Sequence, residues 1–294
     1  MSDLNYHCKW RLELAKRICE KIKIVEGTKG IKGIKAIIVG GSVARGYADE
    51  YSDIEIPIFW DELPNENIRK LIIKELNAEC FYPYNHEARE DNIIVNGFRI
   101  DLWHITLEQE EEVIKSVIKD FEIDFGSSNA IDTIRTCIPM FGEEIINSWK
   151  AKVKEYPRQI AIENINKALQ SIDSTQVELY LQRENSTLLF EHIANLQKSI
   201  FLILLALNNE YFPTFKWMYK SLESFKIKPD NIEQRFRYVF NYPPKEAFEK
   251  TLVIMFETFD MINKIYPEIN TNIVLNKLKS ARIPQYLIRQ AGMQ

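Results

Sequence analysis

The spacing of apolar residues changes several times along the N-terminal part of the chain, and each change predicts a different element. Over residues 4–25 apolar side chains recur at helical spacing with lysine and arginine between them, which predicts an amphipathic helix. A short apolar run over 34–39 predicts a strand, and a second strand is expected over 51–59. Pro57 lies in that second run and indicates an edge strand or an irregularity, because proline cannot donate to a sheet.

Two further strand-like runs are joined by Asn96-Gly97. This dipeptide is the strongest short signal for a β-hairpin, because both residues tolerate positive φ angles. Alternate residues of a strand share a face, so Arg99, Asp101 and Trp103 are expected to lie together on the second arm. Asp101 is then a carboxylate on a strand otherwise built for burial, which makes it a candidate functional residue.

Strand signals nearly vanish after the hairpin, and helical patterns take over. Residues 107–119 predict an acidic helix, 124–129 a turn-rich loop, and the chain from 143 onward a succession of helices. The predicted fold class is α/β followed by α: a small mixed-sheet head and then an all-helical bundle. We place the two domains at 1–120 and 121–294, a division that suits the length of the chain.

Composition narrows the classes of protein to consider. A net charge of −4 and a pI near 5.8 argue against a protein that coats nucleic acid. The four cysteines show no CxxC spacing, which argues against a zinc or disulfide framework and favours a reducing compartment. The longest apolar run, 200–207, is too short to cross a bilayer, and the first residues lack the apolar core of a signal peptide. We therefore expect a soluble cytoplasmic protein without a membrane partner.

The chemistry-bearing residues concentrate around the two predicted strands of the head. The first strand ends in glycine and then Gly41-Ser42, and the second begins with Asp53 and Glu55 two positions apart. Those carboxylates point to the same side of a strand. A flexible glycine and a hydroxyl followed by two aligned carboxylates indicate a phosphate cradle that faces a metal clamp.

This stretch resembles the signature of the nucleotidyltransferase superfamily related to DNA polymerase beta, whose small members include the antibiotic nucleotidyltransferases. The matching parts are Gly41-Ser42, Arg45-Gly46 and Asp53-Ile54-Glu55. Glu55 departs from the pattern, since the second acidic position is more often Asp. The order of the parts, a sheet head and then a helical bundle, also resembles the antibiotic nucleotidyltransferases, and 212–217 looks like a segment common in one uncharacterised group.

The resemblance implies roles for the acidic residues. Asp53 and Glu55 would hold two magnesium ions, which in such sites lie about 3.5–4 Å apart. Asp101 matches the family's third carboxylate, from a later strand of the same sheet. It would hold the ion nearest the acceptor hydroxyl and take its proton. Gly41 would let the backbone approach the phosphates, and Ser42 would donate to them at a helix start.

Two basic residues have open assignments. Arg45 either contacts the phosphates or closes the turn. Lys198 shares a narrow polar stripe with Glu191 and Asn195 on a helix over 185–207 that is otherwise apolar. That stripe is either a solvent-facing edge, which we favour, or the wall of a cleft in which Lys198 meets triphosphate oxygens.

The leading hypothesis is an adenylyltransferase that moves AMP from ATP, or a related nucleotide, to a hydroxyl of a small molecule. The resemblance suggests an aminoglycoside or lincosamide antibiotic as acceptor. One alternative is a protein AMP-transferase of the antitoxin type, against which the long helical part counts. Another is a nucleotide-binding protein without activity, against which the three filled acidic positions count. The sequence leaves open the acceptor, the preferred nucleotide base and the oligomeric state. It also leaves open whether the general base is Asp101 or a carboxylate of the helical domain.

Overall fold

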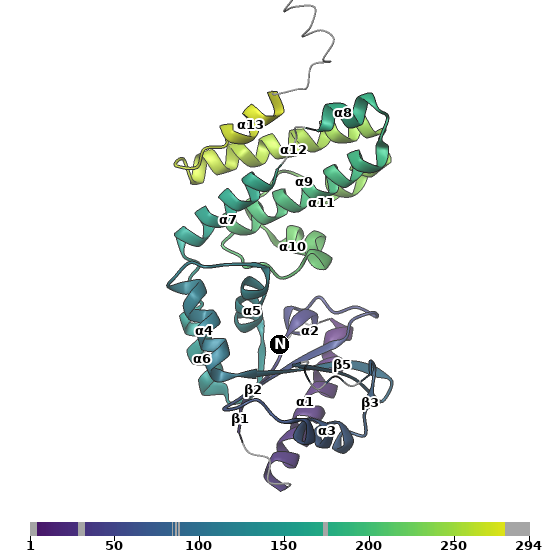
Figure 1. The fold of residues 1–294 in the computed structure, drawn as a ribbon, viewed down its shortest axis with the longest axis vertical. Helices are drawn as coiled ribbons and strands as arrows, with labels where there is room; N and C mark the ends of the chain where they lie inside the picture. The colour runs from purple at the N-terminus through teal and green to yellow at the C-terminus, as the bar shows by residue number, and fades with distance from the viewer. Residues whose placement is uncertain are drawn as a thin grey trace, which may run out of the picture. The chain divides into compact units, whose positions relative to one another are not determined.

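The computed structural model describes residues 5–28, 33–83, 85, 87, 89–172 and 176–279. The chain forms two compact units, Met1–Glu155 and Tyr156–Gln294. The first holds a mixed six-stranded sheet with helices and the second is helical, so the predicted fold class is confirmed (Figure 1). The division between the units falls after Glu155, whereas the sequence placed the domain boundary after residue 120.

The strands of the first unit form one sheet in the order β3-β4-β5-β2-β1-β6. Their bounds are Ile34–Val39 for β1, Ile54–Trp60 for β2, Glu79–Cys80 for β3, Glu90–Val95 for β4, Phe98–Thr106 for β5 and Ile138–Phe141 for β6. The helices of this unit are α1 Tyr6–Thr28, α2 Gly41–Arg45, α3 Glu66–Glu75, α4 Leu107–Ile118, α5 Phe125–Thr136 and α6 Glu143–Lys152. β2 and β5 pair in parallel and the other neighbours are antiparallel.

One face of the sheet is buried under α1 and α3 (Figure 1). Alternate residues of the strands point to this face, and they pack with the apolar stripe of α1 into one hydrophobic core. The strand residues of this core are Ile34, Ile37, Val39, Ile54, Ile56, Ile58, Trp60, Ile93, Val95, Ile100 and Leu102. The alternation read from the sequence therefore assigns this face correctly.

A polar network is buried within the same layer. Trp60 Nε1 donates to His104 Nδ1 at 3.2 Å, so His104 Nε2 carries the proton and donates to Asp91 at 2.9 Å. Arg69 from α3 donates to both Asp91 oxygens, at 3.0 and 2.6 Å. This network ties α3, β2, β4 and β5 together beneath the sheet.

The opposite face is covered by helices over only part of its width. Phe59 on β2 packs edge-on against Trp149 of α6, with ring centroids 4.9 Å apart. β6 extends the sheet beside β1, and α4, α5 and α6 pack together around it. Residues 121–155 therefore belong to the first unit because a strand among them completes its sheet.

Three local predictions differ from the structure. Pro57 lies in the central strand β2, so the edge position is wrong, whereas the alternative of an irregularity agrees with the register shift in the pairing of β1 with β2. It is tolerated because the register pairs of β1 with β2 end at Ile58, so the missing N–H interrupts no pair on that side. The predicted loop over 124–129 instead begins α5, since Asp124 and Ser127 form a capping box. β6 was not predicted. By contrast, the hairpin at Asn96-Gly97 is confirmed.

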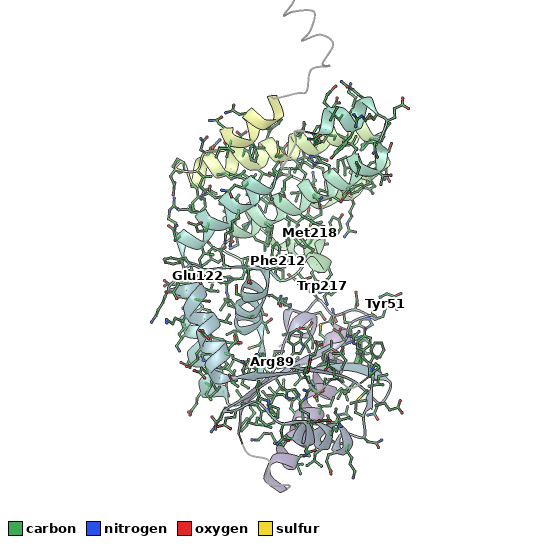
Figure 2. The ribbon with its side chains drawn as sticks, in the orientation of Figure 1. Tyr51, Arg89, Glu122, Phe212, Trp217 and Met218 are labelled. Atoms are coloured by element: carbon green, nitrogen blue, oxygen red, sulfur yellow. The ribbon has the colours of Figure 1, made fainter. Side chains whose placement is uncertain are left out.

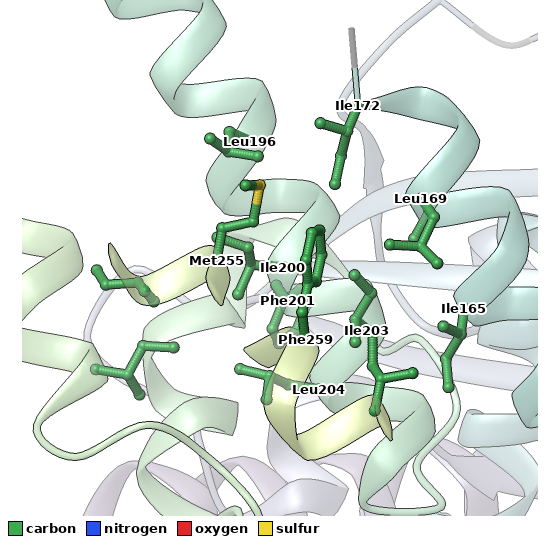
Figure 3. Close-up of a cluster of buried hydrophobic side chains, with 14 of the residues drawn as sticks. Ile165, Leu169, Ile172, Leu196, Ile200, Phe201, Ile203, Leu204, Met255 and Phe259 are labelled. Atoms are coloured by element: carbon green, nitrogen blue, oxygen red, sulfur yellow. The ribbon is translucent and has the colours of Figure 1, made fainter. Parts of the chain in front are cut away.

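The second unit is built around the long helix α9, Ser186–Leu207. The other helices of this unit are α7 Arg158–Ser171, α8 Val177–Gln182, η1 Phe215–Trp217, α10 Met218–Ser224, α11 Ile232–Tyr238, η2 Val239–Asn241, α12 Pro244–Ile265 and α13 Asn272–Lys279. Figure 3 shows Ile200, Phe201 and Leu204 of α9 packed among side chains that include Leu169 of α7 and Phe259 of α12. The core of this unit is thus formed by α9 with its neighbours.

By length and composition, α9 is the one helix of the described residues that would be able to cross a membrane. More than half of its most apolar window is buried within the structure. Its apolar character is accounted for by its place in the core, since helices that are hydrophobic nearly all round are typical of protein interiors.

Candidate active site

The sheet brings the predicted carboxylates to one place. Glu55 on β2 and Asp101 on β5 are register partners on neighbouring parallel strands, and such strands lie about 4.8 Å apart. Asp53 directly precedes β2, and its charge acts on Asp101. All three positions therefore lie at the same end of adjacent strands, on the face that the helices cover only in part.

Asp101 is held in an environment that disfavours its charge. The residue is 6% exposed, and burial raises the pKa of its carboxyl group. Arg99 opposes that rise, while the negative charges of Asp53 and Glu90 add to it. The net result is a pKa above the ordinary value for aspartate.

Arg99 pairs with this carboxylate. Its Nε donates to Asp101 Oδ1 at 3.2 Å and its Nη2 to Asn92 Oδ1 at 3.4 Å. The guanidinium also lies over the rings of Phe81 and Tyr82, at 4.8 and 5.7 Å from their centroids. The sequence placed Arg99 on the same face as Asp101 but gave it no role in the site.

The glycine turn makes contact with a carboxylate. Gly41 has a φ of +58°, and a Cβ built there would lie 2.5–2.7 Å from the carboxyl atoms of Glu55. Glycine is required here by the backbone angle and by the closeness of Glu55. The sequence predicted that a phosphate would lie beside Gly41. In the structure the Glu55 side chain lies there.

Ser42 is buried within α2, which has only five residues. The N-cap of this helix is Gly40 rather than Ser42, and no side chain caps it. The Ser42 carbonyl accepts from the backbone N–H groups of Tyr47 and Ala48. Ser42 thus helps to shape the turn, and its predicted contact with a phosphate stays a prediction.

Arg45 makes a buried ion pair with Asp132 of α5, to which its Nε donates at 2.7 Å. Thr133 of the same helix lies against Gly40. Of the two roles considered for Arg45, the contacts in the structure are those of a residue that closes the turn. They also fix α5 against the glycine segment.

Hydrogen bonds from Arg11 of α1 fix the loop that leads to Asp53. The sequence did not indicate this contact. Arg11 is buried and donates through Nε to the Ser52 carbonyl at 2.9 Å and through Nη2 to the Glu50 carbonyl at 3.3 Å. Asn5 donates to the Ala48 carbonyl at 2.9 Å. The pattern of α1 assigned its arginines to a solvent-exposed face, so no signal distinguished Arg11 from the others.

Lys198 belongs to the second unit. It is exposed on α9 together with Glu191 and Asn195, and its Nζ lies 5.6 Å from the ring centroid of Phe215. Exposure of all three fits the solvent-facing interpretation of this stripe. A contact between Lys198 and a triphosphate stays a prediction.

The fit of the residues to magnesium is partial. Carboxylate oxygens are ligands that magnesium prefers, so Asp53 and Glu55 fit a divalent cation by their chemistry. Asp101 fits a second ion less well, because its Oδ1 accepts from Arg99 and an ion there would share the carboxylate with that guanidinium. Among the residues that the structure describes, no three His, Cys, Asp or Glu side chains converge as a metal-binding group. The predicted two-ion arrangement stays a prediction.

Part of the chain matches a known protein family. Residues 138–218 match the model of a domain of unknown function, DUF4037, and this stretch includes the segment 212–217. No curated protein matches the chain. Among solved structures it is similar to a nucleotidyltransferase-like protein from Exiguobacterium sibiricum 255-15, with 10% identity over 86% of this chain and 80% of that chain. The TM-score of 0.33 is too low to carry an argument about activity.

Proposed function

We propose that this chain is a nucleotidyltransferase that moves a nucleoside monophosphate, AMP from ATP in the first instance, to a hydroxyl group of a small molecule. The observation that carries the proposal is the register pairing of Glu55 with Asp101, with Asp53 just ahead of β2. The motif resemblance at Gly41-Ser42 and Asp53-Ile54-Glu55 supports it from the sequence.

The reaction makes and breaks one bond each at phosphorus. The acceptor hydroxyl oxygen bonds to the α-phosphorus while the bond from that phosphorus to the pyrophosphate oxygen breaks. Pyrophosphate leaves with the electron pair, and the hydroxyl proton passes to a base. Because the phosphates repel an incoming oxygen, the protein contributes mainly by positioning and by neutralising charge.

In this proposal each carboxylate has a role. Asp53 and Glu55 would hold the magnesium that accompanies the triphosphate, and the chemistry it would supply there is neutralisation of phosphate charge. Asp101 accepts the proton of the acceptor hydroxyl, for which it must lie within hydrogen-bond reach of that oxygen. Arg11 keeps the approach to Asp53 in place through the Ser52 carbonyl.

The acceptor in this proposal is a small molecule, and aminoglycosides and lincosamides are the first to test because of the resemblance. A cavity of about 290 Å³ next to β4 offers room beside the strand that carries Asp101. It is lined by Cys80, Tyr82, Pro83, Asn85, Glu90, Asp91 and Asn92. Glu90 and Tyr82 in this lining suit a cationic ring-bearing acceptor.

The test is pyrophosphate release from labelled ATP and magnesium in the presence of an acceptor panel. We expect release that depends on one acceptor and is lost in Asp53→Ala. A mass gain on a protein partner instead of a small molecule would favour the protein AMP-transferase. Calorimetric binding of magnesium-ATP without turnover would favour a binding protein, and absence of binding would contradict the site assignment itself.

A further inference from the structure

Arg99 is fixed in place more firmly than a surface arginine. Its side chain is 37% exposed, yet Asp101, Asn92 and the rings of Phe81 and Tyr82 all contact the guanidinium. Contacts with two aromatic faces and two oxygen acceptors restrict a planar group in orientation as well as position. The positive charge therefore has a defined place beside Asp101.

The position beside Asp101 is also the one at which a metal ion was predicted from the sequence. Asp101 was assigned to the ion nearest the acceptor hydroxyl, and its Oδ1 carries Arg99 instead. A guanidinium and a magnesium ion would compete for the same carboxylate, because both are held there by its negative charge. Glu55, the register partner of Asp101, turns its carboxyl group toward Gly41.

We propose that Arg99 takes the place of the second divalent cation, so that the site binds one ion, on Asp53 and Glu55, with a guanidinium fixed on Asp101. This inference rests on the proposed function. It specifies which groups supply positive charge to the site that would carry out the transfer. Within the described part of the chain, the hydrogen bonds of Arg99 use Nε and Nη2, which leaves the donors of Nη1 for an incoming oxygen. Arg99 is then a positioning and charge-neutralising residue on the acceptor side.

The test counts bound Mn²⁺ as a paramagnetic substitute for magnesium, on the full chain with a non-hydrolysable ATP analogue. We expect one Mn²⁺ per chain in the wild-type protein, two in Arg99→Gln, and one in Arg99→Lys, which keeps the charge. Arg89→Gln is the matched control and should stay at one. Arg89 is an exposed arginine just before β4, labelled in Figure 2. Thermal unfolding of each variant shows that it is folded.

The outcomes separate this inference from the proposed function. Two Mn²⁺ ions in the wild-type protein would overturn the inference and leave nucleotidyl transfer standing. One ion in Arg99→Gln would also overturn it, because removal of the guanidinium would then free no cation position. No Mn²⁺ in the wild-type protein, with the nucleotide analogue present, would overturn the proposed function as well.

Discussion

Two arginine–aspartate pairs lie on neighbouring strands of one sheet, and they show how differently a carboxylate can be held. Asp91 on β4 lies in the layer under α3, and Asp101 on β5 lies on the opposite, partly open face. Arg69 reaches both oxygens of Asp91, and His104 adds a third hydrogen bond. Arg99 meets Asp101 through one contact of 3.2 Å.

The pKa shifts of the two carboxyl groups follow from these contacts. Burial alone would raise the pKa of Asp91, but hydrogen bonds from His104 and Arg69 hold it below its ordinary value. Burial raises the pKa of Asp101, and Arg99 does not offset the rise. A carboxylate whose two oxygens both accept hydrogen bonds from the protein stabilises the fold. A carboxylate with fewer such hydrogen bonds can still accept one from a ligand.

The largest effect is expected where the carboxylate is fully engaged. Asp91→Ala leaves Arg69 buried without its partner, and such losses cost about 3–5 kcal/mol of unfolding free energy. Asp101→Ala is the matched variant and should cost under about 1 kcal/mol, because Arg99 is partly exposed and can be solvated. Guanidinium denaturation at pH 7 measures both. Equal losses would abolish the distinction between the two pairs.

Turnover should depend on the carboxylate that directly precedes β2. Asp53→Ala is expected to lower the rate of transfer by about 10²–10³, the scale for the loss of one electrostatic contact to the reacting groups, with little change in stability. Asp61→Ala is the control, since Asp61 follows β2 at its other end and pairs with Lys35 at the surface. Initial rates with the acceptor from the panel provide the measurement. An unchanged rate in Asp53→Ala would remove the site assignment.

The hairpin that carries Asp101 could be predicted because it depends on local patterns. Alternation assigned the faces of the strands, and Asn96-Gly97 fixed where the hairpin turns. That Asp101 belongs with Asp53 and Glu55 was suggested only by the family resemblance, since the two strands are far apart in the sequence. The parallel pairing of β2 with β5 places the two carboxylates as neighbours.

The groups that surround these carboxylates could not be predicted, because their partners are distant in sequence. Arg45 and Asp132 are 87 residues apart, and Arg11 meets the Ser52 carbonyl 41 residues away. No local pattern marks which arginine of a helix will be buried. β6 has too few residues to show a strand period, and its pairing with β1 is seen only in the folded chain.

Glu110 extends the comparison to a carboxyl group with still fewer contacts. It is 4% exposed on α4, and its Oε1 has no hydrogen-bond partner among the residues that the structure describes. Burial raises its pKa from 4.5 to about 7. The folded state therefore keeps this proton up to about pH 7, whereas the unfolded chain releases it near pH 4.5. Stability is lost as the pH rises through that interval, by about 3 kcal/mol in all.

Glu110→Gln cannot ionise and should remove this pH dependence. We expect it to be more stable than the wild-type protein by about 3 kcal/mol at pH 8.5 and nearly equal to it at pH 4.5. Urea denaturation at the two pH values measures the difference. Glu112→Gln, at an exposed position of the same helix, is the control. A gain of the same size at both pH values would mean that ionisation of Glu110 is not its cause.

The smallest effect concerns the contact between Gly41 and Glu55. Gly41→Ala and Gly97→Ala both place a side chain at positive φ, and each should cost about 1–2 kcal/mol of stability. A Cβ at position 97 meets nothing within 4 Å, whereas one at 41 displaces the Glu55 carboxylate. Transfer should therefore fall about tenfold in Gly41→Ala alone, below the 10²-fold that a 1 Å misplacement can cost. Equal rates in the two variants would show that the position of Glu55 against the turn has no part in the site.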